Sequence, residues 1–184
     1  PIEPRDAARL LVLEREGGAL AELRFADLAA SVGPHDLVVV NDTRVRPAKL
    51  RGRKASGGKA EALLLERRPD STWTALVRAR GRLATGLELV FGALSAQVVE
   101  VLPGGACRLA FESADGRSED AVLESIGEAP LPPYIARESP NARDLADYQT
   151  IFAREPGAVA ARTAALAFTR ELACRLRIER VTLC

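Results

Sequence analysis

The chain has 184 residues, of which 47% are hydrophobic and 28% are charged, with a formal net charge of +1, a balance that excludes a wholly disordered protein. Three widely spaced cysteines and a single histidine, His35, offer neither a disulfide framework nor transition-metal ligand spacing, so we expect a reduced, cytoplasmic setting without metal. No signal-peptide pattern is present and no apolar run approaches the roughly 18 residues of a membrane-spanning helix, so we expect no membrane partner.

The first part of the chain predicts two strands separated by a turn and a short helix. Residues 9–15 indicate a strand and 16–18 a turn, and apolar residues at i, i+3, i+4 and i+7 predict a helix over 25–32. The apolar run 37–40 is rich in β-branched residues, which predicts a strand buried on both faces. The polar residues 41–43 predict a turn at its carboxyl end, where open α/β sheets bind ligands.

The most basic segment of the chain runs from residue 44 to residue 59 and contains seven Lys or Arg and no acid. A surface this positive favours phosphate. Its end combines cations with a serine and glycines whose backbone amides can bind an anion: Arg53, Lys54, Ser56, Gly57, Gly58 and Lys59. The same composition is typical of ordinary hairpin connections, so both interpretations stay open.

After the basic segment the pattern changes to short strands separated by turn residues. Apolar and β-branched residues predict five strands, at 60–66, 72–78, 87–91, 96–102 and 107–111. No long helix interrupts them, so we expect a small antiparallel barrel or sandwich. Trp73 is a candidate for stacking on a nucleic-acid base, but a core position is the commoner role of a lone tryptophan in a small β module.

The chain then returns to helices through a proline-rich connector. Ser118 is a suitable N-cap for a helix that ends at Gly127. The run 130–135 holds three prolines, which favours a stiff extended connector over the alternative of a polyproline ligand. We therefore predict an α/β domain made of residues 1–58 and 130–184, incomplete at both ends, with a small antiparallel β-barrel domain inserted at 59–129.

The last part of the chain predicts two helices and a strand. The first helix carries Tyr148, Ile151 and Phe152 and ends at residues 155–157. The second spans 169–177 with Thr169 as its cap, and a closing strand follows at 178–183. Between them, the small residues 157–161 would allow either a flat ligand to approach the backbone or a helix to pack tightly on a sheet.

Several motifs together resemble the amino-terminal half of the S-adenosylmethionine:tRNA ribosyltransferase-isomerases, enzymes of the queuosine pathway. The first motif is Val-Val-Asn-Asp-Thr-Arg-Val at 39–45, which continues into the basic segment. The later motifs are Leu-Pro-Pro-Tyr-Ile at 131–135, Tyr-Gln-Thr at 148–150 and Glu-Pro-Gly-Ala-Val-Ala-Ala at 155–161. Four separate motifs in the family's order, over nearly the whole chain, make this resemblance specific.

The resemblance implies a transferase and isomerase built from an α/β domain with an inserted antiparallel barrel. It implies that S-adenosylmethionine donates a ribosyl unit, which is isomerised on the 7-aminomethyl-7-deazaguanine wobble base of tRNA to give epoxyqueuosine. Such chemistry needs a positioned base and the exclusion of water. A monomer is the favoured state, and no metal is expected.

The family motifs also suggest site residues, although no catalytic residue can be assigned. The substrate-binding residues implied by the resemblance are Asn41, Asp42, Thr43, Arg44, Tyr134, Tyr148, Gln149, Gly157, Ala158, Val159 and Thr163. The residues expected to bind tRNA phosphate are Arg51, Arg53, Lys54, Ser56, Gly57, Gly58 and Lys59.

One motif departs from the family pattern. Where the family has Pro-Thr-Ala-Gly-Leu-His-Phe, residues 162–168 are Arg-Thr-Ala-Ala-Leu-Ala-Phe. Alanine moves no protons, so an acid or base role at Ala167 is absent, and Ala165 adopts a glycine-only conformation only with strain of about 1 kcal/mol. We interpret the chain as a truncated or diverged relative. The alternative function is a non-catalytic RNA-binding module derived from the same fold.

Overall fold

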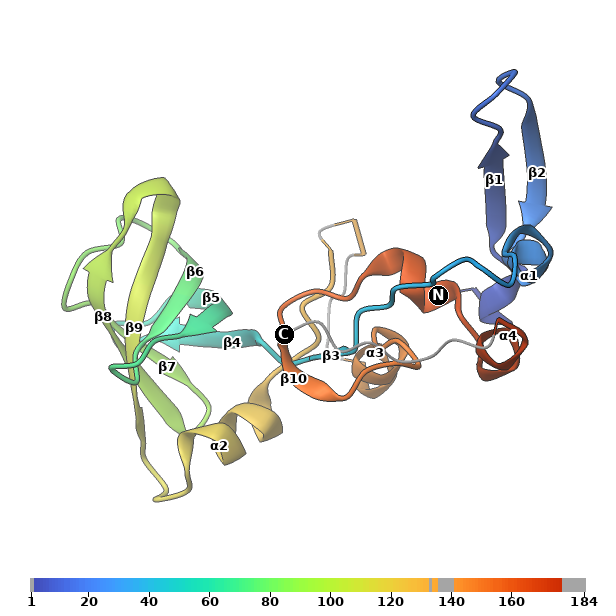
Figure 1. Cartoon of the computed structure of the whole chain (residues 1–184). Coiled ribbons are helices and arrows are strands. Elements are labelled where there is room, and N and C mark those ends of the chain that lie inside the picture. Colours follow the sequence, from blue (N-terminus) through green and yellow to red (C-terminus); the bar gives the residue numbers. More distant parts are fainter. Residues whose placement is uncertain (1, 133, 136–140, 177–184) are drawn as a thin grey trace. The chain divides into compact units, whose positions relative to one another are not determined.

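The computed structural model describes residues 2–132, 134–135 and 141–176, and the chain divides into two compact units. The first unit, Pro1–Val45 with Ala146–Cys184, is called the two-segment unit here. The second, Arg46–Leu145, is the barrel unit. Figure 1 shows the strands and helices of both along the chain.

The barrel unit is built on six strands that form a closed barrel in the order β4-β5-β6-β9-β8-β7, and every neighbouring pair is antiparallel. The strands are β4 (Lys49–Lys54), β5 (Lys59–Arg67), β6 (Trp73–Ala79), β7 (Glu88–Phe91), β8 (Leu94–Val101) and β9 (Ala106–Ser113). The predicted antiparallel barrel is thereby confirmed, and five of its strands lie where the alternation of apolar residues indicated them.

The strand that sequence reasoning missed is β4, which lies in the barrel although the insertion was predicted to start at residue 59. Its sequence is Lys-Leu-Arg-Gly-Arg-Lys, so polar side chains hide the alternation. Leu50 is fully buried, while Arg51 is half-buried and Arg53 exposed. Because successive side chains point to opposite faces of a strand, one leucine and one glycine suffice for the inward face of β4.

The barrel core is filled by inward-facing side chains from all six strands. Trp73 is 4% exposed and its Nε1 donates a hydrogen bond to Glu119 Oε1 at 2.7 Å, which confirms the core position predicted for this residue. The side chains with no measurable exposure include Leu50, Leu89, Phe91, Leu94, Val98, Cys107 and Leu109. Such a core determines the register, because a shift of one residue would turn each strand's apolar face outward.

Helix α2 (Glu119–Ile126) follows the barrel and begins as predicted. Ser118 is the N-cap, and its Oγ accepts a hydrogen bond from the amide of Ala121 at 3.3 Å. Val122 and Leu123 are buried, and Gly127 ends the helix. A Cβ on Gly127 would overlap the carbonyl oxygen of Pro47, so the close approach of these two backbones requires a glycine.

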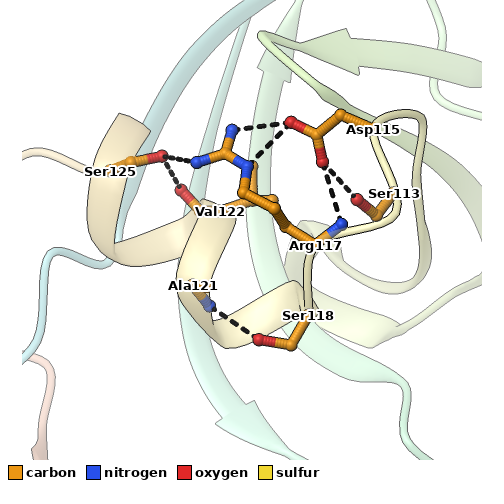
Figure 2. Close-up of polar contacts among 7 residues, drawn as sticks. All are labelled: Ser113, Asp115, Arg117, Ser118, Ala121, Val122 and Ser125. Carbon is orange, nitrogen blue, oxygen red and sulfur yellow. Dashed lines mark hydrogen bonds and ion pairs between the residues drawn. The ribbon is translucent and has the colours of Figure 1, made fainter.

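The turn before α2 contains a charged cluster centred on Asp115 and Arg117 (Figure 2). Asp115 Oδ2 lies 2.8 Å from Arg117 Nε and 2.7 Å from Arg117 Nη2. Asp115 Oδ1 accepts hydrogen bonds from the Arg117 amide at 3.1 Å and from the Ser113 hydroxyl at 3.0 Å. Hydrogen bonds from the Arg117 side chain, and then from its amide, lower the pKa of Asp115 to about 2.

This lowered pKa predicts an acid-dependent contribution to stability. A carboxylate whose folded pKa lies below its unfolded value, near 4, stabilises the fold above that value, and the contribution is lost as pH falls through about 2. We therefore expect Asp115→Asn to lower the free energy of unfolding at pH 7 and to make no difference near pH 2. Urea unfolding at both pH values measures this change.

The matched control for this prediction is Glu124→Gln in α2. Glu124 is exposed and takes part in no ion pair within the described residues, so its removal should change stability equally little at both pH values. The prediction is wrong if the Asp115→Asn difference persists unchanged at pH 2.

The two-segment unit contains two small sheets and several short helices. Strands β1 (Arg9–Leu13) and β2 (Leu20–Arg24) form an antiparallel hairpin, and β3 (Thr43–Val45) pairs in parallel with β10 (Glu155–Ala158). The α-helices are α1 (Leu28–Ser31), α3 (Ala142–Asp147), which spans the boundary of the two units, and α4 (Arg170–Arg175). The 3-10 helices of the chain are η1 (Arg5–Ala7), η2 (Phe25–Asp27), η3 (Pro103–Gly105, in the barrel unit) and η4 (Thr163–Ala167).

Three predictions for this unit need correction or lie outside the described residues. Residues 37–40 form no strand, and Leu37 and Val39 are 72% and 55% exposed. A strand needs a hydrogen-bonded neighbour, and in the described part of the chain the pairing with β10 starts only at Thr43. The predicted strand at 178–183 lies outside the described residues.

The predicted helix with Tyr148, Ile151 and Phe152 was also placed wrongly. The helix is α3, which ends before Tyr148, and residues 155–158 form β10 instead of a helix end. Asn141 Oδ1 accepts a hydrogen bond from the amide of Arg143 at 2.9 Å, so the helix begins directly after this cap. Tyr148 and Phe152, which follow the helix, lie in turns and are buried, and Ile151 is half-buried.

Candidate functional site

A cavity of about 350 Å³ lies within the two-segment unit. This volume falls in the range of small-molecule sites. Two segments far apart in the sequence form its wall: residues 39–42 before β3, and residues 162–168, which include η4. The lining residues are Val39, Val40, Asn41, Asp42, Arg162, Ala164, Ala165 and Phe168.

The first wall is held in place by the β3 and β10 segments. Asn41 Oδ1 accepts hydrogen bonds from the Thr43 hydroxyl and from the Thr43 amide, the latter at 3.0 Å. The carbonyl oxygen of Asp42 accepts from the amides of Arg154 and Glu155 at 2.7 and 3.3 Å. The predicted polar turn is therefore present, and its backbone is bonded to the family motif that starts at Glu155.

The second wall is held by an aromatic cluster. Phe168 is 7% exposed, and its ring packs edge-on against Phe25 at 5.0 Å and Phe152 at 5.3 Å between centroids. Leu172 of α4 belongs to the same cluster and is 1% exposed. Thr169 caps α4 by accepting a hydrogen bond from the Leu172 amide at 3.2 Å. The end of η4 is thus anchored beside the cavity.

The cavity is mostly apolar, with one side chain of each charge in its lining. Asp42 is half-buried, Arg162 is exposed, and Ala164 and Ala165 leave space beside them. Two opposite charges in an apolar surround suit a ligand that itself carries both charges.

Two of the predicted substrate-binding residues, Asn41 and Asp42, line the cavity. Of the other predicted residues beside them, Thr43 is half-buried and Arg44 exposed in β3, and Thr163 is exposed at the start of η4, next to the lining residues. The residues that sequence reasoning did not assign include Arg162, Ala164, Ala165 and Phe168. The sequence signal for them is the motif at 162–168, which departs from the family pattern.

Gln149 was predicted to bind substrate, and the structure shows its amide bonded to β3. Gln149 Oε1 accepts a hydrogen bond from the Val45 amide at 2.9 Å, and Nε2 donates one to the Val45 carbonyl at 2.7 Å. The Gln149 carbonyl also accepts from Arg5 Nη1 at 2.7 Å. Through these hydrogen bonds Gln149, in the turn after α3, is connected to both the amino-terminal segment and β3.

The remaining predicted residues lie outside the cavity lining. Tyr148 is 5% exposed, Gly157 and Ala158 lie in β10, and Val159 is half-buried directly after it. Tyr134 is 79% exposed and belongs to the barrel unit.

The predicted phosphate-binding residues lie on β4, on β5 and in the hairpin that joins them. Gly57 and Gly58 have φ values of +91° and +85°, which favour glycine, and the Gly57 amide donates to the Lys54 carbonyl at 2.9 Å. The Lys54 amide donates to the Gly58 carbonyl at 3.0 Å. These bonds are those of an ordinary hairpin connection, and they engage the Gly57 amide within the turn.

Neither a metal centre nor a membrane span is found among the described residues. They include no group of three or more His, Cys, Asp or Glu placed to hold a metal ion. Their helices are all too short or too polar to cross a bilayer.

Comparison with known proteins shows the family of the chain. The sequence profile of the family described as Queuosine biosynthesis protein matches residues 1–184. The S-adenosylmethionine:tRNA ribosyltransferase-isomerase of Moorella thermoacetica is 49% identical over 180 residues, which cover 96% of this chain and 52% of that protein. The protein of the same name from Anaeromyxobacter dehalogenans strain 2CP-1 is 48% identical over 179 residues, with coverages of 96% and 51%.

Among solved structures, the chain is similar to the S-adenosylmethionine tRNA ribosyltransferase of Thermotoga maritima, with 27% identity and a TM-score of 0.39. The match covers 99% of this chain and 51% of that one. The chain spans about half the length of the curated relatives it matches. Because the family profile covers the whole chain, the resemblance predicted from the four motifs is confirmed, and the chain belongs to the queuosine biosynthesis protein family.

Proposed function

We propose that the protein is an S-adenosylmethionine:tRNA ribosyltransferase-isomerase that takes S-adenosylmethionine and tRNA as substrates. The names of its relatives support this activity. The observation that carries the proposal is the cavity, because it joins the motif at Asn41 and Asp42 with the motif that begins at Arg162. We further propose that the reaction takes place in the cytoplasm, as the sequence predicts.

The chemistry of the cavity fits S-adenosylmethionine. This molecule carries a carboxylate, an ammonium group and a sulfonium beside an apolar purine. In our proposal the Arg162 guanidinium attracts the carboxylate, and the Asp42 carboxylate attracts the positive groups. The apolar wall at Val39, Val40 and Phe168 contacts the purine and excludes water, as the loss of adenine requires.

A direct test combines calorimetry with a turnover assay. We expect heat on titration of the protein with S-adenosylmethionine. With tRNA that carries 7-aminomethyl-7-deazaguanine, we expect release of adenine and epoxyqueuosine in the digested tRNA, measured by mass spectrometry. Binding of tRNA without product and without heat at millimolar S-adenosylmethionine would contradict this proposal. That result would support the non-catalytic RNA-binding module, which the alanine at position 167 favours.

A variant that fills the cavity tests its role in binding. We expect Ala165→Leu to weaken S-adenosylmethionine binding at least about tenfold, because the new side chain occupies space that the ligand needs. Isothermal calorimetry measures the change.

The matched control is Ala167→Leu. Ala167 lies in the same 3-10 helix and is also half-buried, but it does not belong to the cavity lining. If both variants bind S-adenosylmethionine as tightly as the original protein, the ligand binds elsewhere.

A further inference from the structure

One end of the barrel collects cations from three neighbouring strands and one loop. The end of β4 lies beside the start of β5, with Arg53 opposite Lys59, and β5 lies beside β6, with Glu61 opposite Arg78. The last residues of β6 therefore lie at the same end of the barrel as the β4–β5 hairpin. We name the six cations at this end the cation cluster: Arg53, Lys54, Lys59, Arg78, Arg80 and Arg82.

The loop after β6 is tied to β4 by a side chain of the cluster. Lys54 Nζ donates a hydrogen bond to the carbonyl oxygen of Arg80 at 2.5 Å. A Cβ on Gly81 would lie 3.6 Å from the same nitrogen, so the loop backbone passes directly over Lys54. Arg80 and Arg82 flank Gly81 in the sequence and are both exposed. The loop therefore adds positive charge to the hairpin that the sequence had singled out.

Among the cations between residues 46 and 117, the cation cluster differs from the others because it makes neither an ion pair with a described residue nor a cation–π contact. Arg51, which was predicted to bind phosphate, lies 3.0 Å from Glu128. The other cations between residues 46 and 117 are also engaged, with carboxylates or with the Trp73 ring: Arg46, Lys49, Arg67, Arg68, Arg108 and Arg117.

Within the described residues, no ion pair involves a member of the cation cluster. Two acids, Glu61 and Glu88, lie at the same end of the barrel, so six positive and two negative side chains leave a local charge of +4. Five of the six cations are exposed, and Lys54 is half-buried. Unpaired exposed cations gathered in one place favour a polyanion, because each contact with phosphate releases a condensed counterion.

We propose that the cation cluster binds the phosphate backbone of tRNA. The identity of the RNA as tRNA rests on the proposed function. The inference adds Arg78, Arg80 and Arg82 to the predicted phosphate-binding residues and removes Arg51 from them. The six side chains bind phosphates without reading bases, so they position the tRNA and do not select it.

Matched triple variants test the cluster. The first is Arg78→Gln, Arg80→Gln and Arg82→Gln, and the control is Arg67→Gln, Arg68→Gln and Arg117→Gln, which removes the same charge from paired arginines of the same barrel. Binding of a fluorescein-labelled tRNA transcript with guanosine at the wobble position is measured by anisotropy at several KCl concentrations. We expect the first variant to bind at least about tenfold more weakly near 0.1 M salt, with a salt slope lower by roughly two to three.

The control triple should change the affinity and the slope far less. Equal affinity of the first variant and the original protein, or an equal loss in the control, overturns the inference. Circular dichroism and the unfolding midpoint establish that both variants are folded.

The same variants separate this inference from the proposed function. S-adenosylmethionine binding by the first triple should equal that of the original protein, because the cluster and the cavity share no residue. If the original protein forms no product yet binds tRNA through the cluster, the proposed activity fails and the inference stands. If the original protein modifies tRNA and the first triple binds it unchanged, the inference fails and the proposed activity stands.

Discussion

Replacing Gly52 with alanine is expected to lower the free energy of unfolding of the barrel unit by roughly 3 kcal/mol or more. A Cβ at this position of β4 would overlap the carbonyl oxygen of Val90 and lie 2.5 Å from Cδ1 of Phe91. Val90 and Phe91 belong to β7, the neighbouring strand of the closed barrel, and Phe91 is fully buried. The neighbour is largely backbone in a hydrogen-bonded sheet, so the clash cannot be relieved by a side-chain rotation.

Urea unfolding followed by fluorescence measures this effect, because Trp73, the only tryptophan, lies in the barrel core. Gly33→Ala is the control, since its Cβ would meet its nearest neighbour, Asp36 Oδ2, only at 3.4 Å. The control variant should have the same unfolding transition as the original protein when it is followed by tryptophan fluorescence. The transition followed by circular dichroism should be nearly the same. A Gly52→Ala protein within about 1 kcal/mol of the original would show that β4 and β7 do not approach as closely as described.

Replacing Phe168 with alanine is expected to cost the two-segment unit about 3–5 kcal/mol. Phe168 packs edge-on against both Phe25 and Phe152, so one ring joins the amino-terminal segment to the carboxyl-terminal one. Its removal leaves a void next to an existing cavity, and the remaining side chains cannot fill both. We also expect S-adenosylmethionine binding to weaken, because the wall at η4 loses its anchor.

Thermal unfolding by circular dichroism and hydrogen exchange in α1 and α4 measure the loss. The control is Leu37→Ala, which removes an apolar side chain that is 72% exposed and should change stability by no more than about 0.5 kcal/mol. A double-mutant cycle with Phe25→Ala should give a coupling of about 0.5–1.5 kcal/mol. Equal stability of the Phe168→Ala and Leu37→Ala proteins would exclude the aromatic cluster as the support of this unit.

The barrel strands were predictable because their pattern is local. In β5, β6 and β8 every second residue is buried over 60–64, 73–77 and 94–98, and the turns between the strands carry Gly, Pro or Asp. Strand β4 was not predicted from the sequence because its outward residues are all Lys or Arg, a composition typical of a loop. At residues 37–40 a strand was predicted where none forms, because apolar β-branched residues favour a strand but cannot supply the neighbouring strand that it must pair with.

The candidate site was only partly predictable. Asn41 and Asp42, which the turn chemistry and the resemblance predicted as substrate-binding residues, line the cavity. Gln149 also lies in a family motif, yet its amide is bonded to Val45, and no sequence pattern distinguishes such a hydrogen bond from a ligand contact. Only the hairpin members of the cation cluster were predicted, because they are close in sequence, whereas Arg78 lies in β6 and Arg80 and Arg82 follow that strand.

The sequence alone determined the family, the antiparallel barrel and the segments that carry the motifs, because these depend on local residue order and on spacing. Only the tertiary structure decided which motifs meet in one cavity, since Asp42 and Arg162 are brought together by packing around Phe168. It also decided which cations are neutralised, because Arg51 is half-buried beside Glu128, whereas Arg53, two residues on, is exposed and makes no ion pair with the described residues. Charge pairing and cavity formation are properties of residues distant in sequence, which a pattern along the chain does not contain.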